Sequence, residues 1–169
     1  MLLQSTFLKR DNFTAGVSLI CLLVILAGYS GSGVAMSLFS SKEVVLFSDV
    51  EGSITYDGKP ISGATILRTS KWQKENSDSV ITENDGSFRM PAITMSHNSL
   101  LPSQFVSHQR ITVQYQGNDF VIWSMGKINP ELDGELGGKK IKFTCELKDE
   151  MEPVDVPEGL LVTACKLQQ

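Results

Sequence analysis

The sequence is poor in histidine, a residue that zinc sites and many hydrolytic sites use. Only two histidines occur, His97 and His108, and there is no Cys-x-x-Cys or His-x-His pair. A zinc site would need further ligands at usable spacing. Ser96 and Ser107 directly precede the histidines, but a nucleophile and its base need converging side chains, which sequence neighbours rarely supply. We therefore expect no metal, no cofactor and no catalytic residue.

The sequence also lacks an excess of basic residues. The net charge is −4, and without the first 35 residues, which hold Lys9, Arg10 and Asp11, 13 basic and 18 acidic residues leave a net charge of −5. Binding to nucleic acid depends largely on lysine and arginine contacts with phosphate. This charge balance argues against nucleic acid as a partner.

One apolar segment stands near the N-terminus, behind Lys9 and Arg10. The 24 residues Ala15–Leu38 are uncharged, and as a helix they would span about 36 Å, enough to cross a bilayer core. One interpretation is a membrane anchor; the other is a signal peptide cleaved after Ala35. Both place the following domain outside the cytoplasm, in the periplasm or anchored to the inner membrane and facing it. A third possibility is a chain that begins at Met36 and stays in the cytoplasm. We assign residues 1–38 to this hydrophobic helix.

Residues 43–169 read as one all-β domain. Short runs of alternating polar and apolar residues are separated by turn signals such as Asp57-Gly58, and no amphipathic helix follows residue 40. This spacing favours an antiparallel β-sandwich. Loops are expected at 71–78, 93–107 and 126–138. The nine expected strands are Glu43–Phe47, Glu51–Tyr56, Ala64–Thr69, Ser79–Thr82, Ser87–Met90, Gln109–Tyr115, Phe120–Trp123, Lys140–Leu147 and Gly159–Leu167.

Two stretches of this domain resemble a known module. Val50–Ile66 has a glycine in its first strand, a polar turn, and then Lys-Pro-Ile-Ser-Gly-Ala leading into a second strand. Thr82–Phe88 supplies Thr-Glu-Asn-Asp-Gly-Ser-Phe. Together they resemble the opening of a carboxypeptidase regulatory-like domain. The resemblance implies a prealbumin (transthyretin-like) sandwich over residues 50–90. It says little about function, because this module serves as an accessory or binding domain in many settings.

The cysteines allow one pairing within the domain. Cys21 lies in the apolar segment, which leaves Cys145 and Cys165, each in a terminal strand. An oxidising compartment favours a disulfide between them. The alternative is a pair of buried free thiols.

Large apolar side chains in the expected loops are the candidate partner contacts: Trp72, Leu100 and Leu101. Trp72 has a second interpretation, as a lid that folds back on the sandwich. The acidic stretch 149–158 lacks the ligand periodicity of a calcium loop and reads as a solvated connection.

These features favour a non-enzymatic protein of the bacterial envelope that binds another protein, as an accessory subunit or a toxin-neutralising immunity protein. An alternative is a carbohydrate- or cell-wall-binding module in which Trp72 and Trp123 stack on sugars. A hydrolase with a site built from the 93–108 and 149–158 segments is a further alternative.

Overall fold

The computed structural model describes residues 41–97 and 104–168. They belong to the second of the two units into which the chain divides, Met1–Leu38 and Phe39–Gln169. The expected N-terminal helix, and with it Leu100 and Leu101, lies outside the described residues. Within the described part no helix is long and apolar enough to span a membrane.

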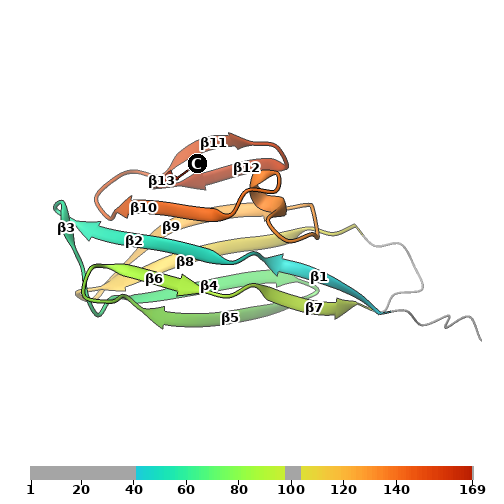
Figure 1. Cartoon of the computed structure of the whole chain (residues 1–169), viewed down its shortest axis with the longest axis horizontal. Coiled ribbons are helices and arrows are strands. Elements are labelled where there is room, and N and C mark those ends of the chain that lie inside the picture. The colour runs from blue at the N-terminus through green and yellow to red at the C-terminus, as the bar shows by residue number, and fades with distance from the viewer. Residues whose placement is uncertain (1–40, 98–103, 169) are drawn as a thin grey trace, which may run out of the picture. The chain divides into compact units, whose positions relative to one another are not determined.

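The described unit is all-β and is built from three sheets (Figure 1). The largest sheet runs in the order β11 (Glu152–Val156), β12 (Gly159–Thr163), β9 (Asn118–Lys127), β8 (Ser107–Tyr115), β4 (Thr65–Trp72) and β5 (Lys74–Ile81). The second runs β13 (Cys165–Leu167), β10 (Ile141–Glu146), β2 (Val50–Tyr56) and β3 (Lys59–Pro60), with β6 (Ser87–Met90) also paired to β2. The third is the pair β1 (Lys42–Phe47) and β7 (Ile93–His97), and a 3₁₀ turn, η1, covers Gly134–Leu136.

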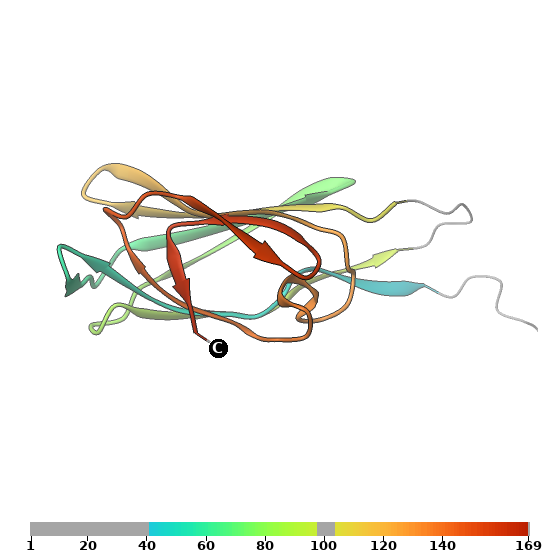
Figure 2. The same ribbon diagram turned by 90° about the horizontal axis from the view of Figure 1, so that it is seen from above.

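The six-stranded and five-stranded sheets form the two layers of a sandwich (Figure 2). Alternate residues of both sheets point inward, so that Ile54 and Phe143 meet Ile111 and Trp123 in one apolar core. The Trp123 and Phe143 rings lie 6.1 Å apart between the layers. The predicted sandwich is therefore confirmed at the level of architecture.

One pairing departs from the antiparallel arrangement that the sequence suggested. β2 and β10 run parallel, with Ile141 opposite Val50 and Cys145 opposite Ile54. A parallel pair needs a long crossover connection, and here the chain passes through the other sheet between these two strands. All other strand pairs of the described residues are antiparallel.

Each of the nine expected strands overlaps a strand of the structure, but two expected loops are wrong in part. Residues 71–78 form the reversal between β4 and β5 and the first part of β5, with Gln73 at φ 56° at the turn. The polar β5 carries no hydrophobic alternation. It is held instead by its register with β4 and by the buried Arg68, whose guanidinium donates to both carboxylate oxygens of Asp78 at 3.0 and 2.6 Å.

The expected 93–107 loop likewise begins with a strand. β7 pairs with β1 along its whole length, and neither strand extends the main sheets. The last expected strand, Gly159–Leu167, is divided at Ala164 into β12 and β13, which join different sheets. Pairing partners distant in sequence decided each of these boundaries.

Candidate functional site

The segment between β9 and β10, here called the 128–140 loop, presents apolar side chains to solvent. Ile128 is 50% exposed and Leu132 is 51% exposed. The loop follows Lys127, the last residue of β9, which pairs with Ser107 of β8. It lies beside β1 at the β1–β7 end of the sandwich (Figures 1 and 2). The Val45 amide donates to the carbonyl of Pro130 at 2.8 Å, which joins the loop to the free edge of β1.

A fully buried ion pair fixes this loop. The Lys127 ammonium and the Glu135 carboxylate are both inaccessible to solvent and lie 3.0 Å apart. Lys127 also donates to the carbonyl of Glu131 at 2.9 Å and to the Ser48 hydroxyl at 3.2 Å. The Lys127 ammonium thus contacts Glu131 and Glu135, the two ends of a short segment of the loop. Leu132 lies within this segment, and Ile128 directly follows Lys127.

Glu135 completes the brace from the other side. Its carboxylate accepts from the Ser48 amide at 2.9 Å, the Ser48 hydroxyl at 2.6 Å and the Gln109 side chain at 2.7 Å. The Asp133 amide donates to the Ser48 hydroxyl at 2.8 Å. Buried charges are tolerated when their hydrogen-bonding capacity is satisfied in this way.

Burial controls the electrostatics of the pair. Desolvation lowers the pKa of Lys127 below its ordinary value, and the nearby Glu135 carboxylate opposes this shift without cancelling it. Buried polar contacts hold the backbone of the 128–140 loop in place, while the side chains of Ile128 and Leu132 are exposed to solvent.

Trp72 lies at the end of β4 and is buried, with 8% of its surface exposed. It packs in a small apolar cluster with Val44 and Leu46, and its indole nitrogen donates to the carbonyl of Gln104 at 3.2 Å. The rings of His97 and Phe105 contact it edge-on, at 4.6 and 5.0 Å between centroids. The structure therefore places Trp72 inside an apolar cluster, and both the lid role and a direct role in partner contact stay predictions.

The histidines do not converge. His97 contacts Trp72, which points to the inner side of the six-stranded sheet. His108 is paired with Lys71, the residue before Trp72, and is exposed on the opposite face. The acidic stretch 149–158, expected to be a connection, instead contains β11, which lies three strands away from β8. Within residues 41–97 and 104–168 no group of three potential metal-ligating side chains is found.

The two tryptophans share no exposed surface on which a sugar could stack. Trp123 is fully buried in the main core, and its indole nitrogen donates to the Gln109 side chain at 3.3 Å. Trp72 is buried in the separate cluster described above. The aromatic platform that a carbohydrate-binding module requires is therefore not formed by these two residues.

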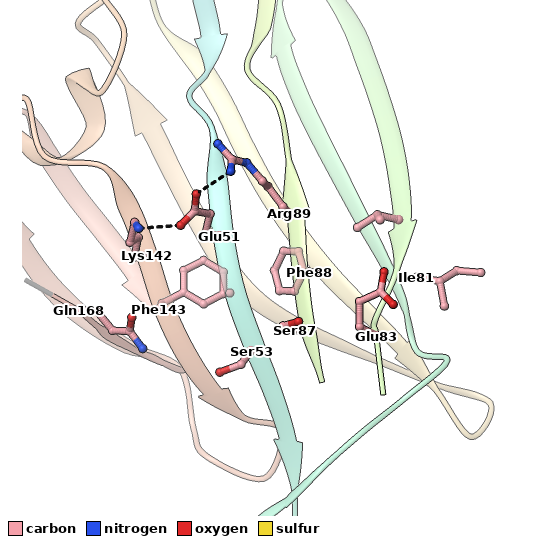
Figure 3. Close-up of a pocket in the computed structure, with 12 residues that line it drawn as sticks. Glu51, Ser53, Ile81, Glu83, Ser87, Phe88, Arg89, Lys142, Phe143 and Gln168 are labelled. Atoms are coloured by element: carbon pink, nitrogen blue, oxygen red, sulfur yellow. Dashed lines mark ion pairs between the residues drawn. The ribbon is translucent and has the colours of Figure 1, made fainter. Parts of the chain in front are cut away.

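A trough of about 560 Å³ crosses the outer face of the five-stranded sheet (Figure 3). Glu51 lies between Lys142, at 2.7 Å, and Arg89, at 3.3 Å. The hydrogen bond from Lys142 lowers the pKa of Glu51. Because Glu51 and Glu83 balance Lys142 and Arg89 in its lining, this trough offers no preference for one charge of ligand.

Ile128 and Leu132 are residues to which the sequence reading gave no role. The sequence contains a signal that could have identified them as contact residues. Both are large apolar side chains in the expected 126–138 loop, the same feature that identified Leu100 and Leu101 as candidate contacts. What the sequence did not show was that Lys127 and Glu135 fold inward and fix this loop.

The described residues thus form a small β-sandwich domain with two exposed apolar residues on a loop held by buried polar contacts. The chain belongs to the family described as a domain of unknown function, DUF6795, which matches residues 50–150 and thus more than half of the chain. The matched region extends from β2 past β10 and includes the 128–140 loop. No curated protein and no solved structure matches the chain.

Proposed function

We propose that the domain is a non-catalytic protein-binding module that contacts its partner through the 128–140 loop. The observation that carries this proposal is the half-exposed pair Ile128 and Leu132 on a loop braced by the buried Lys127–Glu135 ion pair. Apolar residues on loops positioned by a rigid scaffold are common contact residues. Fixing the loop before binding reduces the entropy lost on association.

Trp72, the predicted contact that the structure describes, lies toward the same end of the domain. Trp72 lies beside His97 and Gln104, the residues that border the segment carrying Leu100 and Leu101. We therefore extend the proposed surface to this end of the sandwich, with Ile128 and Leu132 as its anchors.

We further propose that the protein acts in the bacterial envelope, as an accessory subunit or an immunity protein. The disulfide between Cys145 and Cys165 supports an oxidising compartment. An enzyme reporter that requires export, joined to Gln169, should be active; an inactive export reporter with an active cytoplasmic one would contradict this location.

A finer fold assignment is part of the same proposal: the sandwich is of the carboxypeptidase regulatory-like, prealbumin type. Three features support it. The turn at Asp57 and Gly58 joins β2 to β3, Gly86 adopts φ 77° ahead of β6, and β2 and β6 are adjacent in one sheet.

Binding is tested by replacing both anchors. The double variant Ile128→Ser, Leu132→Ser should reduce capture of a specific envelope protein at least thirtyfold, because losing buried interface anchors commonly costs about 2 kcal/mol or more. Thermal unfolding should remain nearly unchanged, since both side chains are exposed.

The matched control is Ile81→Ser. Ile81 is 60% exposed, on β5, near the opposite end of the sandwich from the 128–140 loop. Ile81→Ser should leave capture of the envelope protein unchanged. Equal loss of capture in the control and the double variant, or full capture by the double variant, would refute the proposed surface.

A further inference from the structure

The outer face of the six-stranded sheet contains a hollow of about 360 Å³ that the partner surface above does not include. Two cross-strand rows form it. In one row Lys71, His108 and Gly126 are neighbours on β4, β8 and β9; in the next row the neighbours are Thr69, Arg110 and Ser124. The long side chains of Lys71, His108 and Arg110 thus lie beside the small residues Gly126, Thr69 and Ser124. This difference in side-chain size leaves the hollow open.

The charge of this hollow is one-sided. None of the residues that line it is acidic. Six other basic residues of the described chain form ion pairs, whereas Lys71 and Arg110 form none with any described residue. Lys71 and Arg110 are diagonal neighbours on adjacent strands, whose backbones lie about 7–8 Å apart at such positions. An anion held between the two side chains would be attracted by both charges. Glu75 of β5 lies opposite Lys71 in the strand register, but it is not part of the lining of the hollow.

The donor set suits a tetrahedral oxyanion. The guanidinium of Arg110 can donate two parallel hydrogen bonds, and the ammonium of Lys71 adds a point charge. The hydroxyls of Thr69 and Ser124 are further donors in the same lining. Leu160 and Val162 of β12 form an apolar wall beside these donors, which can contact a carbon body attached to the oxyanion.

We infer that this hollow binds a phosphate-bearing ligand, with Arg110 and Lys71 as the principal contacts. The site lies on a different surface from Ile128 and Leu132, and either proposal can fail without the other. A phosphate group could be free or part of a larger molecule such as a lipid headgroup. Inorganic phosphate and glycerol phosphate distinguish these sources, because only the second has carbon atoms to place against Leu160 and Val162.

Isothermal titration calorimetry tests this inference. Inorganic phosphate or glycerol phosphate is titrated into the full chain in an uncharged detergent at low ionic strength. Saturable binding is expected. The double variant Lys71→Ala, Arg110→Ala should weaken it about tenfold or more, as expected when charge-assisted hydrogen bonds are lost. Glu75→Gln should strengthen binding about twofold by removing the competing carboxylate. Arg89→Ala, on the other sheet and paired with Glu51, should leave binding unchanged.

Tighter binding of glycerol phosphate would support a headgroup-type ligand on the apolar wall, and equal binding would support a bare phosphate site. Unchanged unfolding temperatures of the variants would show that the losses are local. Absence of saturable binding of both probes, or an equal loss in Arg89→Ala, would overturn the inference.

Discussion

At the scale of single residues, Gly52 shows how one missing side chain shapes the core. It lies on β2 directly between Phe88 of β6 and Phe143 of β10. These two rings meet across it, with centroids 5.9 Å apart. A Cβ atom at this position would lie 2.6 Å from Phe88 and 2.7 Å from Phe143. Only glycine leaves room for both rings under this strand.

Gly52→Ala should therefore destabilise the domain by about 1–3 kcal/mol, the usual cost of overpacking a core. Chemical denaturation followed by fluorescence of the buried Trp123 measures the loss. Gly126→Ala is the matched control, since a Cβ there meets its nearest atom at 3.8 Å. It should be close to neutral. Equal stability of the two variants would contradict the packing argument.

At the scale of elements, Glu146 at the end of β10 joins that strand to the hairpin between β2 and β3. Its carboxylate accepts from the amides of Asp57 and Gly58, at 3.0 and 2.9 Å, and from the Thr55 hydroxyl at 2.8 Å. Lys148 adds an ion pair to Asp57 at 2.5 Å. The turn is therefore fixed by a strand that lies about 90 residues further along the chain.

This arrangement predicts a pH-dependent contribution to stability. Desolvation raises the pKa of Glu146, but hydrogen bonds from Gly58, Thr55, Lys148 and Asp57 together outweigh it, so the pKa lies below its ordinary value of 4.5. A carboxylate with a lowered folded pKa stabilises the fold above the unfolded pKa and loses this effect as the pH falls through the folded pKa.

Glu146→Gln should cost about 1 kcal/mol at pH 7, a modest value because the group is only partly buried. The difference from the parent should shrink as the pH falls below about 4.5. Urea unfolding at a series of pH values measures it. Glu43→Gln, on an exposed carboxylate of β1 without a hydrogen bond to any described residue, is the control. A difference that grew with acid would contradict the sign.

At the scale of the whole domain, a buried polar layer connects the main core with the apolar cluster around Trp72. Lys127 of β9, Gln109 of β8 and Arg68 of β4 reach Glu135 or the segment at Ser48 that links β1 to β2. Arg68 also lies over the Phe47 ring at 5.1 Å. These contacts join the sandwich to β1, β7 and the 128–140 loop.

Lys127→Met should cost about 3–5 kcal/mol, because it leaves the Glu135 carboxylate buried without its cation. The double variant Lys127→Met, Glu135→Gln should lose less, since the remaining group is neutral and still accepts hydrogen bonds. Lys166→Met, on an exposed lysine of β13, should change stability by less than about 0.5 kcal/mol. Equilibrium unfolding compares all three. A loss in the double variant as large as that in Lys127→Met would contradict the charge argument.

The sequence by itself determined the elements whose signals are local. Alternation in residues 140–147 predicts β10, and Asp57-Gly58 predicts the turn between β2 and β3, because side-chain period and glycine conformation act over a few residues. The disulfide was also predictable, since only Cys145 and Cys165 remain for the domain. They occupy paired positions of β10 and β13.

Tertiary structure alone decided the features that depend on distant partners. The polar β5 exists because it pairs with β4, and β2 meets β10 in parallel after a long excursion. Lys127 and Glu135 look like surface residues in the sequence, yet they face each other in the interior. A buried charge is stable only where its counter-charge and hydrogen-bond donors converge, and that convergence is a property of the folded chain. The rigid exposure of Ile128 and Leu132 follows from it.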